Sequence, residues 1–246
     1  MNMAEALLRG DGVFETLRIY RGTPFAMRRH LERMARSAGG LRLPLPPASE
    51  LRAAMIQAVA EVGLDEGRLR ITVAGNPEPL VMVAATPLDP WPPTADVAVV
   101  PWPRNERSAV AGLKTVSYAE NDVALAWAAE RDAGEAIFAN TADRLCEGAG
   151  SNVFLVRGGR LLTPALSAGC LAGVTRELLL ELVDAEEADL AIEALAEAEE
   201  AFLTSSTREV QPIRAVDGTL LPAAPGPVTE QAAAAFAALI ARDLDP

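Results

Sequence analysis

Lysine occurs once in this chain of 246 residues, at position 114, and the other 21 of its 22 basic residues are arginines. A sequence this rich in Ala, Arg and Gly is typical of a G+C-rich genome, in which surface lysine is replaced by arginine. Arginine can replace lysine as a solvated cation but not as a nucleophilic amine, because the guanidinium group keeps its proton. Lys114 is therefore a candidate for covalent chemistry, and survival by chance is the alternative.

Composition and the single histidine, His30, exclude several classes of protein. One histidine rules out a zinc site with two or three histidines, and no G-x-S-x-G, G-x-G-x-x-G or Walker motif is present. The net charge of −12 argues against a nucleic-acid partner. The absence of a long apolar run or basic leader, together with the spacing of Cys146 and Cys170, predicts a cytoplasmic protein that has no metal site and does not bind membranes.

The remaining polar motifs meet the demands of one cofactor, pyridoxal 5'-phosphate (PLP). PLP needs a lysine for its imine, a carboxylate beside its pyridine nitrogen, and phosphate donors that often include an arginine and a helix N-terminus. Glu147 lies in a polar turn, CEGAGSN, and an ordinary surface loop is the alternative. The phosphate candidates each have an ordinary structural alternative too; they are the helix start at 173–175, the polar tract at 204–207 and Arg33.

Periodicity predicts an α+β chain. Strands are expected at residues 12–20, 68–74, 80–85, 96–100, 135–139, 152–157, 160–163 and 200–204, and helices at 26–38, 50–62, 119–132, 175–183 and 229–241. Gly39 and Gly40 are expected to end the first helix. A small N-terminal α+β domain is predicted at 1–102, an interdomain linker at 103–112, and a larger C-terminal domain carrying Lys114 at 113–246.

The order of these motifs resembles that of the class IV aminotransferases, the PLP enzymes of fold type IV. The matching segments are GDGVFETLRI, RRHLERM, RLRITV, LKTVSY, EGAGSNVFLVRGGRLLTP, LAGVTREL and EAFLTSSTREVQPIRAVDG. The resemblance implies two α/β domains with PLP in the cleft between them, and a homodimer. It also implies a transaminase acting on an amino donor and a keto acid, or a 4-amino-4-deoxychorismate lyase. A PLP-binding protein without turnover is a third hypothesis, against which the retained lysine argues.

The resemblance assigns roles residue by residue. Lys114 matches the Schiff-base lysine and Glu147 the partner of the pyridine nitrogen, while His30 is expected to be structural. The phosphate would be bound by Arg33, Val174, Thr175, Ser206 and Thr207, and Tyr118 would lie near the ring hydroxyl.

Two departures from the family pattern concern the N-terminus and the substrate. The start of the chain is short, and the insertion that supplies an arginine and a histidine to the substrate carboxylate in D-amino-acid aminotransferases is missing after RITVAG. An aromatic that is usually tyrosine is Phe14 here. The substitutes predicted for the carboxylate are Arg18, Arg21, Arg104 and Arg107, and D-amino acids, with some (R)-amines, are the predicted donors.

Overall fold

A computed structural model describes residues 9–246, which form two compact units. The first unit takes in the chain up to Pro90, together with Leu113–Tyr118 and Leu239–Pro246. The second unit comprises Trp91–Gly112 and Ala119–Ala238. Residues 1–8, which include most of the short N-terminal segment discussed above, lie outside the described residues.

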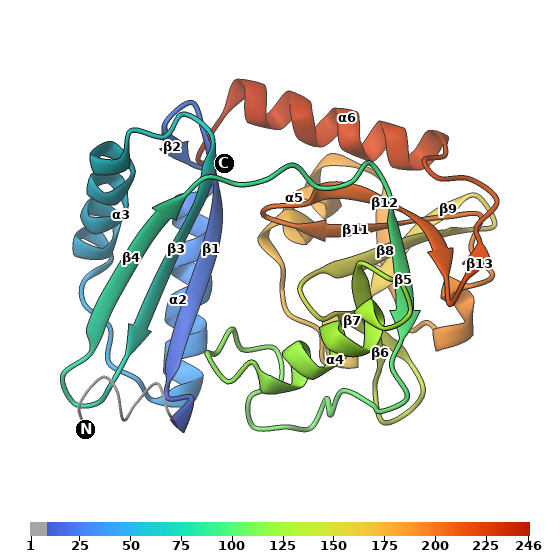
Figure 1. Cartoon of the computed structure of the whole chain (residues 1–246), viewed down its shortest axis with the longest axis horizontal. Helices are drawn as coiled ribbons and strands as arrows, with labels where there is room; N and C mark the ends of the chain where they lie inside the picture. Colours follow the sequence, from blue (N-terminus) through green and yellow to red (C-terminus); the bar gives the residue numbers. More distant parts are fainter. Residues whose placement is uncertain (1–8) are drawn as a thin grey trace. The chain divides into compact units, whose positions relative to one another are not determined.

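The first unit is built on a four-stranded antiparallel sheet with the strand order β2-β1-β3-β4. The strands are β1 (Gly12–Tyr20), β2 (Thr23–Pro24), β3 (Gly67–Ala74) and β4 (Leu80–Thr86). Two helices, α2 (Met27–Leu41) and α3 (Ala48–Val62), pack against it (Figure 1). Val13, Leu17 and Ile19 alternate along β1 and join the apolar side chains of both helices in one core.

The opposite face of this sheet is polar and carries arginines. Because successive side chains of a strand point to opposite faces, Phe14, Thr16 and Arg18 of β1 lie away from the helices. Their partners in the register with β3 are Thr72, Arg70 and Arg68, so these six residues share one face. We call them the arginine face of the first sheet.

Helix α2 passes through the two glycines that were expected to end it. The prediction of a stop at Gly39-Gly40 is wrong, since the last helical residue is Leu41. Arg42 is the C-cap and takes a left-handed φ of 55°. A Cβ at Gly40 would lie 2.6 Å from Leu113 Cδ1. The glycine therefore allows close approach of the segment that carries Lys114, and does not serve as a helix stop.

The segment 113–118 belongs to the first unit because it pairs with β1. Thr115 forms an antiparallel bridge with Val13, Phe14 N–H donates to Lys114 O at 3.1 Å, and Val116 N–H donates to Gly12 O at 2.9 Å. Strand β2 pairs only with the end of β1, which leaves this part of its edge open for residues 113–118. Residues 113–118 were predicted to open the C-terminal domain, but their pairing with β1 places them in the first unit.

The second unit contains a nine-stranded mixed sheet. Its strand order is β10-β9-β8-β11-β12-β5-β6-β7, with β13 paired to β12. The strands are β5 (Ala95–Val99), β6 (Glu135–Ala139), β7 (Leu145–Gly148), β8 (Asn152–Arg157), β9 (Arg160–Pro164), β10 (Ala185–Ala188), β11 (Glu200–Ser205), β12 (Glu209–Val216) and β13 (Thr219–Leu220). The predicted first domain included β5, which instead pairs in parallel with β12 and β6.

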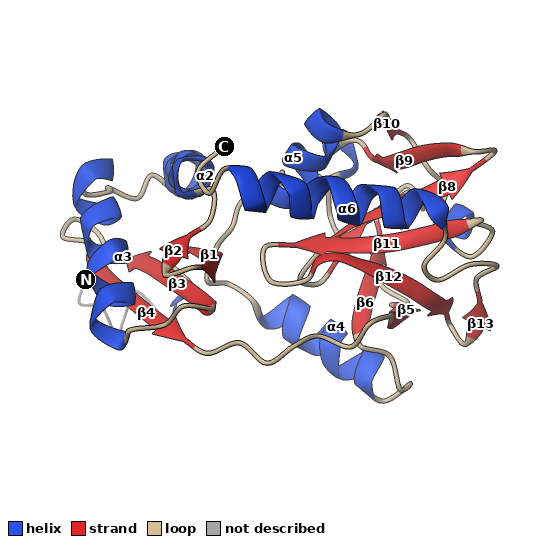
Figure 2. Cartoon of the chain, turned by 90° about the horizontal axis from the view of Figure 1, so that it is seen from above, coloured by secondary structure: helices blue, strands red, loops and turns tan. Residues whose placement is uncertain are grey.

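Helices flank this sheet, as Figure 2 shows. They are α4 (Ala119–Ala129), α5 (Val174–Leu182) and α6 (Pro227–Arg242), with short 3-10 turns at Leu166–Ala168 and Ile192–Leu195. The core is formed mainly by Leu, Val and Ala side chains from β5–β8, β11 and β12. Strand β12 was not predicted, because its residues EVQPIRAV mix charge and proline with apolar positions.

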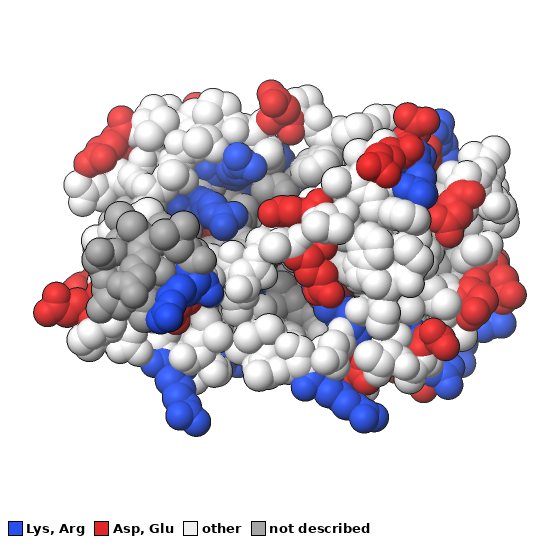
Figure 3. Space-filling model, turned by 60° about the horizontal axis from the view of Figure 1, so that its bottom comes forward, with Lys and Arg blue, Asp and Glu red and all other residues white. Residues whose placement is uncertain are grey.

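The surface of the described residues is acidic and mixed in charge. Acidic side chains lie among Lys and Arg on the face shown in Figure 3, and no continuous basic surface covers it. Among the described helices, none has the length and apolar character needed to cross a membrane.

Candidate active site

Lys114 lies against the ring of Phe14 in the first unit. Its Nζ is 4.5 Å from the ring centre, and the Tyr118 ring meets the same Phe14 edge-on with 5.6 Å between centroids. The backbone bonds between β1 and the lysine segment fix both residues, and Lys114 N–H also donates to Ser37 Oγ at 3.0 Å. The only lysine is therefore held by a strand edge and a helix, and an aromatic ring packs beside its amine.

Arg33 and His30 of helix α2 both contact the side chain of Glu15, a residue of strand β1 in the first unit. Arg33 donates from Nε and Nη2 to the Glu15 carboxylate at 2.9 and 2.6 Å, and His30 Nδ1 lies 2.7 Å from the same carboxylate. Burial alone raises the pKa of Glu15, but the charge and hydrogen bonds of Arg33, with those of His30, lower the pKa to about 2. The arrangement fixes the orientation of the Arg33 guanidinium group.

Helix α2 brings Arg33 and the lysine segment to the same side of the first unit. Ser37, which accepts the hydrogen bond from Lys114 N–H, lies one helical turn beyond Arg33. Burial is the main reason that the pKa of His30 is lowered, and the charges of Arg33 and Lys114 contribute. His30 is thus a buried imidazole that contacts a carboxylate inside the core, and the solvent does not reach it.

Glu147 is positioned in the second unit by strand β7. Its Oε2 accepts a hydrogen bond from Leu171 N–H at 2.8 Å, and Arg104 Nε lies 3.6 Å from Oε1. Arg104 is itself held by Glu120 and Asn121, at 2.6 and 2.7 Å, and stacks over Phe138. The Glu147 carboxylate is therefore fixed at both oxygens by one backbone donor and one cation.

The start of helix α5 has the character of an anion site. Gly173 precedes the helix, and no side chain provides a capping hydrogen bond to its first turn, in which Val174 and Thr175 are buried. A Cβ at Gly173 would lie 1.9 Å from Asn152 Oδ1, so no larger residue fits there. Asn152 also donates to Leu171 O at 2.8 Å, which ties this turn to the Glu147 contact. Uncapped N–H groups at a helix N-terminus favour a bound anion.

The polar tract at the end of β11 adjoins the same asparagine. Thr204 pairs with Asn152 in the sheet register, and its buried Oγ1 has no hydrogen-bond partner among the described residues. Ser206 and Thr207 follow in the turn before β12, where Ser205 Oγ accepts from Arg208 N–H at 3.1 Å. The second unit thus brings together, through Asn152, the α5 start, the β11 end and the Leu171 backbone that contacts Glu147.

The four arginines predicted for the substrate lie in different surroundings. Arg18 is on the arginine face, 3.6 Å from Glu66, and Arg21 donates to Ile240 O at 2.9 Å. Arg104 forms an ion pair with Glu120, and the Arg107 side chain is 87% exposed beside Glu106. None of these contacts tests the predicted substrate roles, which stay predictions.

Sequence reasoning missed Arg70, which is the arginine that stacks on Phe14. Its Cζ is 3.8 Å from the centre of the ring that Lys114 also contacts. A signal was present, because RLRITV alternates charged and apolar residues and so places Arg68 and Arg70 on one face. The sequence could not show that this face meets Phe14, since that depends on the register of β1 with β3.

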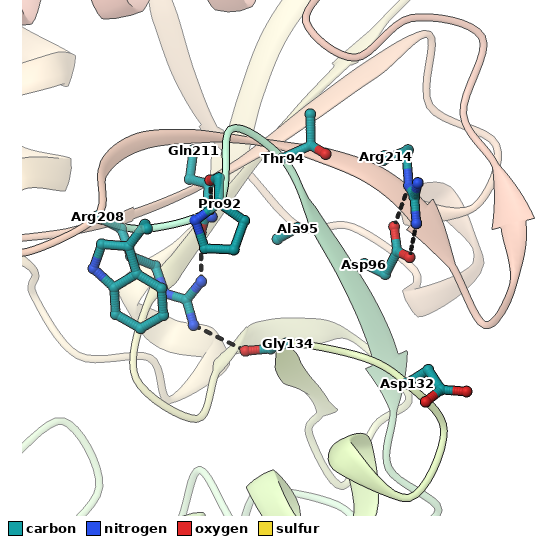
Figure 4. Close-up of a pocket in the computed structure, with 10 residues that line it drawn as sticks. Pro92, Thr94, Ala95, Asp96, Asp132, Gly134, Arg208, Gln211 and Arg214 are labelled. Atoms are coloured by element: carbon teal, nitrogen blue, oxygen red, sulfur yellow. Dashed lines mark hydrogen bonds and ion pairs between the residues drawn. The ribbon is translucent and has the colours of Figure 1, made fainter. Parts of the chain in front are cut away.

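The second unit also has a hollow of about 380 Å³ that contains none of the predicted site residues (Figure 4). Arg208 stacks on Trp91 there, donates to Gln211 and Gly134 O, and lies 3.3 Å from the buried Glu135. Arg214 forms a hydrogen-bonded ion pair with Asp96 on another side. Both arginines of the hollow already have acidic partners, Glu135 for Arg208 and Asp96 for Arg214, and no predicted cofactor-binding residue lines it, so it is not the candidate active site.

Comparison with known proteins identifies the family. Residues 12–216 match the model of the amino-transferase class IV family, and the chain therefore belongs to that family. The D-alanine aminotransferase of Listeria innocua is 31% identical over 90% of this chain and 84% of its own length. A bifunctional aminodeoxychorismate lyase and D-amino acid transaminase of Mycobacterium tuberculosis is 31% identical over 89% of this chain and 86% of its own.

Solved structures agree with this assignment. A hypothetical aminotransferase of Mycobacterium tuberculosis, in its PLP-bound form, superposes with a TM-score of 0.86 at 28% identity, covering 98% of this chain and 93% of that one. The branched-chain amino acid aminotransferase of Escherichia coli gives 0.86 at 27%, covering 94% and 85%. The chain is a PLP-dependent enzyme of fold type IV, and the predictions of family, fold and cofactor are confirmed.

The residues present fit this cofactor. Each chemical demand has a candidate donor whose surroundings hold it in place: an amine at Lys114, a fixed carboxylate at Glu147, and uncapped N–H groups at the α5 start. The buried, unpartnered Oγ1 of Thr204 lies beside the asparagine that contacts Gly173. An orphaned hydroxyl in a core has a free-energy cost, which a bound polar group would relieve.

Proposed function

We propose that this enzyme transfers an amino group between a D-amino acid and a 2-keto acid, with some turnover of (R)-amines. The observation that carries the proposal is the similarity to a D-alanine aminotransferase along nine-tenths of the chain. A class IV aminotransferase acts on an amino donor and a keto acid, so the proposal concerns the configuration and size of the donor.

The roles proposed for cofactor binding follow the residue-by-residue resemblance to the family. Lys114 would bind it covalently, Arg33 and the N–H groups of Val174 and Thr175 would bind its phosphate, and Glu147 would hold a proton at the pyridine nitrogen. Ser206 and Thr207 would complete the phosphate site, and Tyr118 would lie near the ring hydroxyl. When bound, PLP supplies an electron sink for the carbon that loses its proton.

Lys114 would also move the proton of the reaction. With PLP bound, the Lys114 amine would act as the base that takes the proton from the donor α-carbon and as the acid that returns it. The Ser37 hydrogen bond and the pairing with β1 hold the lysine backbone still, and only its side chain must move. Such positioning of a base beside the reacting carbon is a main source of rate acceleration.

The mode of substrate binding differs from the usual trap of D-amino-acid aminotransferases. Strands β3 and β4 are joined by residues 75–79 alone, a turn too short to contain the arginine- and histidine-bearing insertion. Without that insertion, we propose modest affinity and broad tolerance of donor side chains, with apolar contacts contributing more to binding.

A second candidate is 4-amino-4-deoxychorismate lyase activity, which would form 4-aminobenzoate and pyruvate. The observation in its favour is the similarity to the Mycobacterium tuberculosis protein whose name combines this lyase with a D-amino acid transaminase. The lyase would use the same lysine and the same cofactor, so both activities could coexist in one site.

One substrate panel tests both candidates. D-alanine, D-glutamate, L-leucine and (R)-1-phenylethylamine are offered with keto-acid acceptors, beside aminodeoxychorismate. We expect D-alanine or D-glutamate to be the best donor. Exclusive consumption of aminodeoxychorismate would replace the transaminase proposal by the lyase, and preference for L-leucine would overturn the D-specific part.

We further propose a homodimer, as the resemblance to this family implies. The arginine face of the first sheet exposes Arg68 and Arg70, which is compatible with either a partner subunit or a substrate at this surface. Light scattering from nanomolar to micromolar concentration measures the state directly. An active monomer at nanomolar concentration would contradict the dimer.

A further inference from the structure

Two cationic side chains share the ring of Phe14. Lys114 Nζ lies 4.5 Å from the ring centre and Arg70 Cζ lies 3.8 Å from it. Phe14 itself is only 4% exposed, and backbone bonds with β3 on one edge and the lysine segment on the other fix its position. Because both cations contact this fixed ring, the distance between the Arg70 guanidinium group and the Lys114 amine is limited.

Arg70 differs from the other two arginines of the arginine face. Arg18 lies near the Glu66 carboxylate, and Arg68 Nε donates to Thr86 Oγ1 at 3.2 Å. Among residues 9–246, Arg70 has no hydrogen bond or ion pair; its guanidinium group lies over the Phe14 ring and interacts electrostatically with Tyr118. A guanidinium group has five N–H donors, and stacking on a ring leaves all of them directed outward in the plane of the group.

A bound anion would complete this arrangement. Stacking orients the planar group, and an oriented guanidinium binds a carboxylate through two parallel hydrogen bonds. Acidic residues outnumber basic ones in this chain, which has a net charge of −12. Arg70 nevertheless lies exposed beside the only lysine with no carboxylate partner, so its guanidinium group is available to an anion.

We propose that Arg70 binds the α-carboxylate of the amino-acid substrate and thereby takes the place of the missing insertion. The proposal rests on the proposed transaminase function and adds the residue that distinguishes amino acids from plain amines. The amine and carboxylate of an α-amino acid are bonded to one carbon. A substrate that reacts at the position of the Lys114 amine therefore presents its carboxylate within a few ångströms, about the reach of a side chain on the same ring.

The test compares Arg70→Gln with Arg68→Gln, a matched control two residues along the same strand and face. Each holoenzyme is mixed with donor alone, without keto acid, and the bleaching of absorbance near 400 nm is followed with D-alanine and with (R)-1-phenylethylamine. For Arg70→Gln we expect the second-order rate constant of bleaching by D-alanine to fall by roughly 10- to 100-fold and that for the amine to change by less than about 3-fold. Arg70→Lys should recover part of the loss, because lysine supplies charge without the two-pronged geometry.

A binding measurement that needs no turnover accompanies the kinetics. Isobutyrate, a carboxylate without an amine, is titrated into each holoenzyme by calorimetry, and we expect Arg70→Gln to weaken its binding while Arg68→Gln does not. Equal losses with both donors, or unchanged isobutyrate binding, would overturn the assignment, as would a defect confined to subunit assembly in light scattering.

The two proposals fail in different ways. If the wild-type enzyme bleaches with L-leucine and not with D-alanine, the D-specific function fails, and Arg70 is then judged by L-leucine against 3-methylbutylamine. If no donor bleaches the wild type, the transaminase proposal fails, and the isobutyrate titration still decides whether Arg70 binds carboxylates.

Discussion

The carboxylate of Glu15 accepts hydrogen bonds from both Nε and Nη2 of Arg33, at 2.9 and 2.6 Å, where neither residue is more than 5% exposed. His30 packs against the same carboxylate. This buried contact joins β1 to α2 two residues along β1 from Val13, which pairs with Thr115 beside Lys114. It ties the stability of the first unit to the orientation of the arginine proposed to bind phosphate.

Replacing Glu15 by Gln should lower the free energy of unfolding by about 3 kcal/mol at neutral pH. The pKa of Glu15 is depressed from 4.5 to about 2, so its stabilisation is full above 4.5 and is lost as the pH falls toward 2. The difference between wild type and Glu15→Gln, measured by urea unfolding, should therefore shrink between pH 4.5 and 2. A difference that stays constant through this range would show that the ionised carboxylate is not responsible.

Replacing Lys114 by Ala should abolish the absorbance near 400 nm and all turnover, because no other amine side chain exists in the chain. Lys114→Arg should fail equally although it keeps the charge. Absorbance spectroscopy and the donor half-reaction measure both effects. A Lys114→Ala protein with full activity and no added amine would refute the proposed role.

Replacing Glu147 by Gln should leave PLP bound but reduce turnover by two or more orders of magnitude, since an amide does not hold the pyridine nitrogen protonated. Glutamine can still accept the hydrogen bond from Leu171 N–H. Glu120→Gln is the control, because Glu120 also pairs with Arg104. Comparable losses in both variants would point to Arg104 as the sensitive group.

Replacing Arg208 by Gln should destabilise the second unit by about 3 kcal/mol at pH 8, because it leaves Glu135 buried without its cation. Burial raises the pKa of Glu135, and Arg208 opposes this. A raised carboxyl pKa means that the folded state binds more protons above pH 4.5, so the variant should lose less stability at pH 5 than at pH 8.

Arg214→Gln provides the control for this experiment. Arg214 lines the same hollow but forms a more exposed pair with Asp96, and exposed ion pairs contribute little to stability because the solvent screens them. Thermal or urea unfolding at both pH values measures the two variants side by side. Equal effects of Arg208→Gln at pH 5 and pH 8 would argue against a charged Glu135.

The amino-acid sequence by itself determined the chemistry available to this protein. A lone lysine, a glutamate next to a glycine-rich segment and a helix start at Gly173 are local features, and their order along the chain was enough to predict the family, the fold type and PLP. The sequence placed Glu147 in a turn, whereas it lies in strand β7, one residue before Gly148. Strand β1 was also predicted with its observed bounds, Gly12–Tyr20, because alternation within a strand is a local signal.

The tertiary structure alone decided which of these residues share surroundings. The pairing of 113–118 with β1, the continuation of α2 through Gly40, and the contact of Arg70 with Phe14 all depend on residues far apart in sequence. Periodicity gives the face on which a side chain lies, but only strand register gives its neighbour. For that reason the sequence indicated the cofactor, whereas the candidate anchor for the substrate emerged from the packing around Phe14.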